Sequence, residues 1–130
     1  MPLYWTIDSR QRLMTAVAEG DVRKDEAMAY LRAMTGAGAG GYRRLFDGSR
    51  GEPLLSDDDI LELVVEVRRL QTQFEPGPLA IVMRRERFDQ FARLLGALAV
   101  PERPLEFFAD LETGRAWLEQ PSIRNWRAAY

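Results

Sequence analysis

The fold of this 130-residue chain is decided by residues 42–70, YRRLFDGSRGEPLLSDDDILELVVEVRRL. The first six residues, 42–47, are aromatic, basic and aliphatic and predict a short strand, and Gly48 and Gly51 predict a loop after it. A helix is then expected to begin at Ser56, whose side chain can accept a hydrogen bond from the backbone of the first turn. A strand, a loop and a helix in this order form the unit from which α/β proteins are built.

The helix predicted after Ser56 combines charged ends with one broad apolar face. Aspartates follow the cap and arginines occupy the last turn, where each sign of charge is favoured by the helix dipole. The apolar side chains recur at helical spacing, so we expect their face to pack on a sheet. They are Ile60, Leu61, Leu63, Val64, Val65, Val67, Leu70 and Phe74.

The chain before this stretch predicts a hairpin and a first helix. Residues 3–7 and 12–19 are rich in aromatic, β-branched and apolar residues and flank a polar turn, which is typical of two antiparallel strands. We expect Gly20 and Asp21 to end the second strand, and Asp21 to cap a helix that stops at Gly36.

The chain after it repeats the alternation of strand and helix. The uninterrupted apolar run at residues 79–83 predicts a strand that is covered on both faces. Residues 86–99 predict a helix that Pro101 closes, residues 104–108 a last strand, and residues 110–120 a last helix.

The order is therefore β-β-α-β-α-β-α-β-α, and crossover helices of this kind demand a mostly parallel sheet. We predict one α/β domain over residues 1–120, with a mixed sheet of about five strands, an N-terminal β-hairpin and about four helices. Residues 121–130 are expected to form a C-terminal tail.

Composition narrows the function. The chain has 20 acidic and 18 basic residues, a net charge of −2, no cysteine and no histidine. Nucleic acid and anionic membranes are therefore not expected as partners, and disulfides, thiolate nucleophiles, imidazole bases and Cys/His metal sites are excluded. We expect no cofactor and no metal. With no signal peptide pattern and no membrane span, we expect a cytoplasmic protein without membrane insertion.

Several segments together resemble the STAS-like superfamily, the sulfate transporter and anti-sigma-factor antagonist type. The similarity extends over about residues 3–119 and is greatest to the stand-alone bacterial branch, whose members are mostly uncharacterised. The residues that carry it are Tyr4-Trp5-Thr6-Ile7, Gly20, Tyr42-Arg43-Arg44-Leu45-Phe46-Asp47, Ala80-Ile81-Val82, Phe107-Phe108-Ala109-Asp110-Leu111-Glu112 and Ala116-Trp117-Leu118.

The resemblance implies an α/β switch module that binds a partner protein, and in some members a nucleotide or a lipid. In sporulation regulators of this family, a serine in an Asp-Ser-Ser-Gly motif is phosphorylated at the start of the helix that follows the central strand. This chain has Asp47-Gly48-Ser49-Arg50-Gly51 there, and Ser56 only after a longer loop. Ser49 and Ser56 are thus the candidate phosphoacceptors.

Ordinary structural roles compete with both assignments. A phosphate on Ser56 would face three aspartates, so a capping role is favoured for this residue. Ser49 lies beside Arg50, which suits a phosphate better, although Gly-Ser-Arg-Gly is also ordinary turn sequence. The aspartates at 57–59 could suggest magnesium, but consecutive helical residues diverge by about 100° and cannot readily close on one ion.

The glycine-rich segment at residues 36–41, GAGAGG, formally matches the dinucleotide-binding pattern G-x-G-x-x-G. Its context is reversed, because it follows a helix and precedes a strand. No helix N-terminus would then face a pyrophosphate, so we interpret the segment as a helix end and a connection.

Arg84, Arg85 and Arg87 follow the buried strand and enter the first turn of a helix, where cations oppose the dipole. Local rules broken in this way often mark functional positions, although these side chains could also extend into water or pair with acidic neighbours. The carboxyl ends of parallel strands share one edge, where open α/β sheets bind ligands. The candidate site for an anion or an acidic partner at this edge is Asp47, Ser49, Arg50, Arg84, Arg85 and Asp110.

The tail offers a second surface. Ile123, Trp126 and Tyr130 share a helical face, and exposed aromatic residues favour protein contacts. These three residues either pack on the chain's own body or form the contact of a homodimer.

We interpret the chain as a non-enzymatic regulatory or protein-interaction module of STAS-like type that acts in signalling, with an unidentified protein partner. The alternative is a small-molecule or anion-binding protein that uses the carboxyl edge of the strands. An enzyme built on carboxylates and arginines is disfavoured, because no acid and base pair can be assigned.

Overall fold

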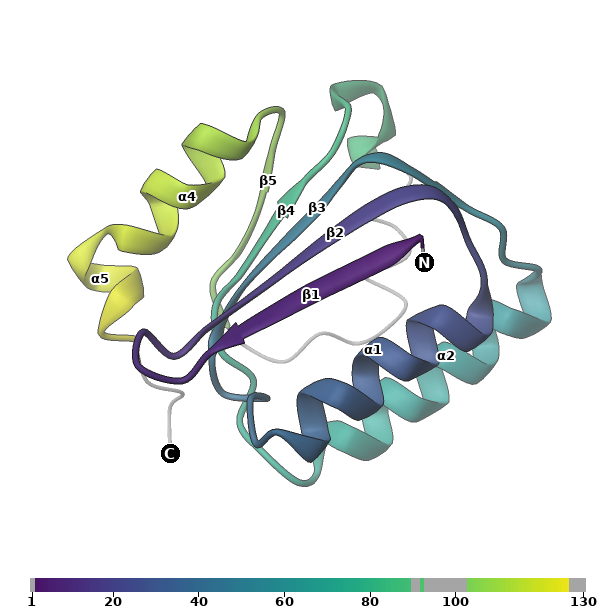
Figure 1. The fold of residues 1–130 in the computed structure, drawn as a ribbon, viewed down its shortest axis with the longest axis horizontal. Helices are drawn as coiled ribbons and strands as arrows, with labels where there is room; N and C mark the ends of the chain where they lie inside the picture. Colours follow the sequence, from purple (N-terminus) through teal and green to yellow (C-terminus); the bar gives the residue numbers. More distant parts are fainter. Residues whose placement is uncertain (1, 90–91, 93–102, 127–130) are drawn as a thin grey trace.

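A five-stranded sheet with the order β1-β2-β3-β4-β5 lies at the centre of the molecule (Figure 1). The computed structural model describes residues 2–89, 92 and 103–126. β1 pairs antiparallel with β2, and the remaining neighbours pair in parallel. The strands are β1 (Leu3–Asp8), β2 (Leu13–Val22), β3 (Arg43–Pro53), β4 (Leu79–Val82) and β5 (Leu105–Phe108). The predicted mixed sheet with an N-terminal hairpin is confirmed.

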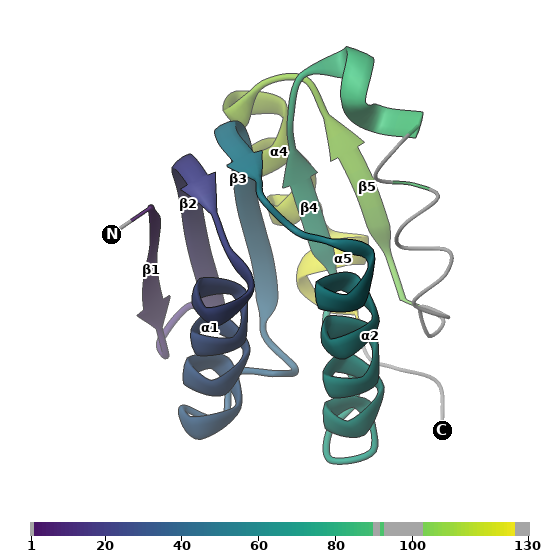
Figure 2. The ribbon, with the colours of Figure 1, turned by 90° about the vertical axis from the view of Figure 1, so that its right-hand side faces the viewer.

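Helices cover both faces of this sheet. α1 (Lys24–Gly36) and α2 (Asp57–Gln71) lie side by side on one face, and α4 (Leu111–Glu119) and α5 (Pro121–Arg124) lie on the other (Figure 1, Figure 2). The strands β2, β3 and β4 are parallel and lie side by side in the order of the sequence. Because crossover connections between parallel strands are right-handed, α1 and α2 lie on the same face of the sheet. The predicted α/β class and number of helices are confirmed in the described part of the chain.

Alternation along β3 divides the core into two sides. Leu45 packs with Leu118 and Ile123 on the α4 face, whereas Phe46 packs with Tyr30 on the α1 face. The same alternation sends the neighbouring Arg43 and Arg44 to opposite faces of the sheet. Both arginines are buried.

Two strands are longer than the sequence predicts. β2 continues to Val22 and β3 to Pro53, because after an irregularity between Val17 and Glu19 the two strands resume parallel pairing at Glu19 and Arg50. The loop predicted at residues 48–51 is therefore strand. Gly51 permits this pairing, because a Cβ atom at that position would lie 2.6 Å from the Cβ of Ala18.

The start of α1 also differs from the prediction. Asp21 still belongs to β2, so it does not cap the helix, and Arg23 occupies the cap position instead. The side chain of Glu26 accepts a hydrogen bond from the Arg23 backbone N–H at 3.1 Å. The glycine-rich segment follows the end of α1, with Gly38 at φ 68°, as a helix end and connection require.

α2 begins as predicted. Ser56 Oγ accepts from the Asp59 N–H at 3.1 Å, and the Asp59 carboxylate accepts from the Ser56 N–H at 3.0 Å, which completes a capping box. The predicted apolar face is too broad, however. Leu61 and Val65 are 61% and 66% exposed, because the sheet and α1 cover only the inner side of the helix.

The helix predicted at residues 86–99 lies mostly outside the described residues. A 3-10 turn, η1 (Arg85–Arg87), is followed by helical residues at 88, 89 and 92. None of the helices in the described ranges has the length and apolar character that a membrane crossing requires.

Candidate functional site

The carboxyl edge of the sheet contains the predicted anion site, and its side chains are engaged with one another. Asp47 is buried and accepts hydrogen bonds from the Ser49 backbone N–H at 3.1 Å and from the Ser49 hydroxyl at 2.6 Å. Because β3 continues through Ser49, the serine lies within a strand rather than at a loop tip. A phosphate there would have to displace this contact with Asp47.

The arginines of the same edge have carboxylate partners that the sequence did not reveal. Arg50 lies 2.9 Å from Glu19 across the β2–β3 pair, and both side chains are exposed. Arg84 and Arg87 converge on Glu52, with Nη2 to Oε1 distances of 3.0 Å and 2.5 Å. Their hydrogen bonds and charges hold the pKa of Glu52 below its usual range, with the bond from Arg87 contributing most.

Asp110 and Arg85 lie near each other at the end of β5. The Asp110 side chain caps α4 by accepting from the Thr113 N–H at 2.9 Å. This bond is the main cause that lowers the Asp110 pKa, and the charge of Arg85 lowers it further. Arg85 also stacks on Phe88, with 5.8 Å between the guanidinium carbon and the ring centroid. Asp110 thus has a capping role.

Metal binding finds no support in the part of the chain that the structure describes, where no three acidic side chains converge on a common point. The hydroxyl of Ser56, the second candidate phosphoacceptor, is used as an acceptor in the capping box of α2. Phosphorylation of Ser49 or Ser56 stays a prediction.

The tail residues separate into buried and partly exposed positions. Ile123 is buried with Leu45 and Leu118 in the core on the α4 face, so it has little surface to offer a partner. Trp126 is partly buried, and its contact with a second copy stays a prediction. Tyr130 lies outside the described residues.

α2 presents an outward face that the sheet does not use. Asp58, Leu61, Val65 and Arg68 are all exposed and follow one another at intervals of three, four and three residues. This spacing keeps the four side chains on one stripe of the helix, the seam geometry of coiled coils. We call these four residues the α2 outer face.

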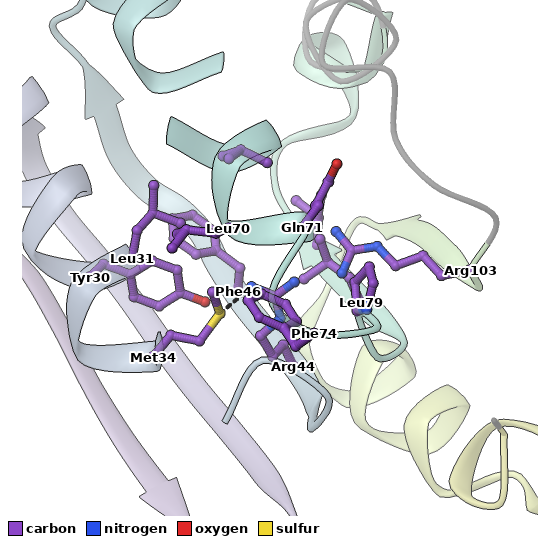
Figure 3. Close-up of a pocket in the computed structure, with 13 residues that line it drawn as sticks. Tyr30, Leu31, Met34, Arg44, Phe46, Leu70, Gln71, Phe74, Leu79 and Arg103 are labelled. Atoms are coloured by element: carbon purple, nitrogen blue, oxygen red, sulfur yellow. Dashed lines mark hydrogen bonds between the residues drawn. The ribbon is translucent and has the colours of Figure 1, made fainter. Parts of the chain in front are cut away.

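A pocket of about 160 Å³ lies between the inner side of α2, α1 and the sheet (Figure 3). Apolar and aromatic side chains form most of its wall, including Leu31, Phe46, Val67, Leu70 and Ile81. Two arginines, Arg44 and Arg103, also line it. We call this cavity the arginine pocket.

Arg44 enters the arginine pocket from β3. It is only 7% exposed, its Nη1 donates to the sulfur of Met34 at 2.7 Å, and its buried Nε has no hydrogen-bond partner. A thioether is a weak acceptor. Tyr30 and Met34, both from α1, also line the pocket (Figure 3).

Arg103 enters from the segment before β5 and points toward Arg44 and Leu79 (Figure 3). Its Nη1 donates to the backbone oxygen of Gly77 at 3.0 Å, and its buried Nε is without a partner. Burial, and after it the charge of Arg44, lowers the Arg103 pKa to about 9. The pocket therefore carries positive charge that its described walls do not neutralise.

The sequence did not single out these two arginines. Arg44 stands inside a predicted strand, and Arg103 precedes one, so both look like ordinary surface residues of an arginine-rich chain. One signal could have been used: Arg43 and Arg44 are consecutive in a central strand, so one of them must face each helical layer.

Arg43 is also a buried arginine of β3, but its guanidinium donates to oxygen acceptors. Its Nη1 donates to the Leu118 carbonyl and to Glu119 Oε1, both at 2.9 Å, and its Nη2 donates to the Gln11 carbonyl at 2.8 Å. Arg43 thereby ties β3 to the end of α4 and to the hairpin turn. Arg44, one residue later, has no such set of oxygen acceptors among the described residues.

Comparisons with known proteins identify the fold. No family model matches the chain, and no curated protein is significantly similar to it. Among solved structures it is similar to an uncharacterized protein from the DUF3478 family, with a SpoIIAA-like fold, from Shewanella loihica PV-4. The match has a TM-score of 0.60 and 21% sequence identity, and it covers 89% of this chain and 93% of the other.

This match confirms the predicted STAS-like architecture, since SpoIIAA-like is the same fold class. At this identity the likeness concerns the fold. Function has to be argued from the surfaces and cavities of this chain.

Proposed function

We propose that this chain is a non-enzymatic regulatory module that binds a protein through the α2 outer face, and that a second copy of the chain is the partner this face fits. The observation that carries the proposal is the exposure of Leu61 and Val65, 61% and 66%, one turn apart on the helix. Aliphatic side chains this exposed on a helix favour burial against another molecule.

The charges that flank these two residues support a second copy as the partner. Asp58 precedes Leu61 at the acidic start of α2, and Arg68 follows Val65 in its basic last turn. Asp58 and Arg68 are each five residues from position 63, and Leu61 and Val65 are each two residues from it. If the helix is reversed about position 63, each apolar residue therefore takes the place of the other, and each charged residue takes the place of one with the opposite charge.

A two-fold axis at position 63 would place two α2 helices antiparallel. Leu61 of one copy would then lie opposite Val65 of the other, and Asp58 opposite Arg68, so that opposite charges face each other at both ends. Antiparallel seams of this spacing pack as knobs into holes. One helix pair is smaller than a standard interface. We therefore expect a weak dimer, with a dissociation constant in the micromolar range or above.

The alternative function, anion binding at the carboxyl edge, has weaker support. Its arginines Arg50 and Arg84 already lie within 3.0 Å of Glu19 and Glu52, so an anion would compete with carboxylates that are present.

Sedimentation velocity over a range of protein concentrations tests the proposal. We expect the weight-average mass to rise toward that of a dimer with concentration, and Val65→Glu to keep the protein monomeric because it buries a charge in the seam. Ala116→Glu, on the exposed side of α4, is the matched control and should dimerise normally. A monomer at every concentration, or an equal effect of both variants, would contradict the α2 contact.

A further inference from the structure

We propose that the arginine pocket binds a small carboxylate whose apolar body is about the size of a benzene ring, with Arg44 and Arg103 holding the carboxylate. This site is separate from the α2 outer face and from the carboxyl edge of the sheet. Its walls come from the inner side of α2, from α1, and from β3 and β4.

The arginine pocket carries unbalanced positive charge. Two guanidiniums enter one largely apolar cavity, and no aspartate or glutamate is among the described residues that line it. Like charges in an apolar site destabilise each other, and a buried ion without a counter-ion costs several kcal/mol. An anion inside the cavity removes this cost, whereas any neutral occupant leaves it in place.

The Nε atoms of Arg44 and Arg103 are both buried and have no hydrogen-bond partner among the described residues, although the large majority of buried polar side-chain atoms in proteins have one. A guanidinium offers Nε and Nη in a planar fork that matches the two oxygens of a carboxylate. One carboxylate placed between the two side chains can accept from both.

The size and the walls of the pocket suit a compact apolar body. A cavity of 150 Å³ with leucine, isoleucine and phenylalanine walls binds benzene, and the arginine pocket measures about 160 Å³. Leu31, Phe46, Val67 and Leu70 supply a similar wall here. The ligand therefore consists of one anionic group and a compact apolar body, and a nucleotide or a sugar phosphate is too large and too polar.

The pocket suits a carboxylate better than a phosphate. A phosphate brings up to two charges and needs donors on every side, whereas the polar side chains among the described lining residues are the two arginines, Tyr30 and Gln71. A carboxylate brings one charge and two oxygens that lie in one plane, and its apolar body can occupy the remaining wall. The monoanion is thus the better match.

Isothermal titration calorimetry and thermal unfolding with benzoate, benzyl alcohol and inorganic phosphate test this inference. We expect benzoate to bind and to raise the melting temperature, since a ligand that binds only the folded state stabilises it. Benzyl alcohol, which has a similar body without the charge, and phosphate, which has the charge without the body, should bind at least about tenfold more weakly.

Arg44→Met and Arg103→Met keep the length of the side chain and remove its charge. Each should weaken benzoate binding by about 10-fold to 100-fold, the loss expected for a charged hydrogen bond. The matched control is Arg115→Met on the exposed side of α4, which should bind benzoate as the wild type does. If one pocket variant fails to fold, the other still decides the outcome.

Three results would overturn the proposal. They are no binding of benzoate to the wild-type protein, equal binding to the folded pocket variants, and phosphate binding as tight as that of benzoate. The last result would mean that the pocket binds an anion but does not recognise the apolar body of the ligand.

Discussion

Arg44 and Arg103 line the same pocket, and the Nε atom of each is buried with no hydrogen-bond partner in the part of the chain that the structure describes. Arg44 is the second residue of β3 and Arg103 lies in the segment before β5, so the two guanidiniums enter the cavity from different segments of the chain (Figure 3). Unpaired buried charge lowers stability, and proteins retain such features chiefly where they serve a site.

The neighbouring residues Arg43 and Arg44 should respond oppositely to loss of charge. Arg43→Met removes three hydrogen bonds to oxygen, so we predict that it lowers the free energy of unfolding by about 2–3 kcal/mol. Arg44→Met removes a charge that has no counter-ion among the described residues, so the free energy of unfolding should stay unchanged or rise by up to ~1 kcal/mol. Urea unfolding of the two variants measures both values. A loss for Arg44→Met as large as that for Arg43→Met would assign Arg44 a structural role.

The pH dependence of stability should reveal the lowered pKa of Arg103. Burial and the charge of Arg44 lower its pKa to about 9 in the folded protein, below the value in the unfolded chain. Between these two values the unfolded chain binds more protons, so the contribution of Arg103 to stability rises with pH. We predict that wild-type protein gains stability relative to Arg103→Met as the pH is raised through about 9.

Urea unfolding at several pH values on either side of that pKa provides the measurement. Taking the difference from Arg103→Met cancels the titration of tyrosines and of other groups that the two proteins share. A constant difference across the range would mean that the Arg103 pKa is not lowered by its surroundings.

A charge exchange on α2 tests the two-fold contact more sharply than loss of the apolar residues. Asp58→Arg alone would place two arginines opposite each other in the antiparallel pair, and Arg68→Asp alone would place two aspartates there. We predict that each single variant weakens the dimer and that the double variant restores much of it, because the pairing is reversed but complementary. Sedimentation velocity gives the dissociation constants.

Circular dichroism is needed beside this experiment, since an arginine in the first turn opposes the helix dipole. If the double variant dimerises no better than the single variants, Asp58 and Arg68 do not meet across a two-fold axis.

The extended pairing of β2 and β3 depends on Gly51. A methyl group there would lie 2.6 Å from the Ala18 Cβ, so we predict that Gly51→Ala lowers the free energy of unfolding by about 1–3 kcal/mol. Gly36 is the control, because nothing lies within 4 Å of a Cβ at that position. Gly36→Ala should leave stability unchanged or raise it by up to about 1 kcal/mol. Thermal and urea unfolding compare the two, and equal effects would argue against the close contact of the strands.

The sequence was most informative where local chemistry determines structure. The cap at Ser56 follows from side-chain and backbone groups within four residues, and it forms as expected. The length of β3 was not predictable in this way, because Gly48 and Gly51 are turn residues by preference and are held in a strand by pairing with β2. The partners of Arg50 and Arg84, Glu19 and Glu52, likewise depend on that pairing.

The surfaces show the same limit. Periodicity places Leu61 and Val65 on a broad apolar face of α2, but only the packing of α1 and the sheet decides which side of that face is covered. Arg44 and Arg103 are 59 residues apart in the sequence and meet only in the folded chain. No local pattern could have joined them.

The most direct test of the arginine pocket is nuclear magnetic resonance of the arginine Nε–Hε groups during titration with benzoate. Among the 17 arginines of the chain, we predict that two signals shift together and saturate. One of them should be absent from the spectrum of Arg44→Met and the other from that of Arg103→Met. If benzoate moves neither of these signals, or moves those of exposed arginines instead, the pocket does not hold a carboxylate.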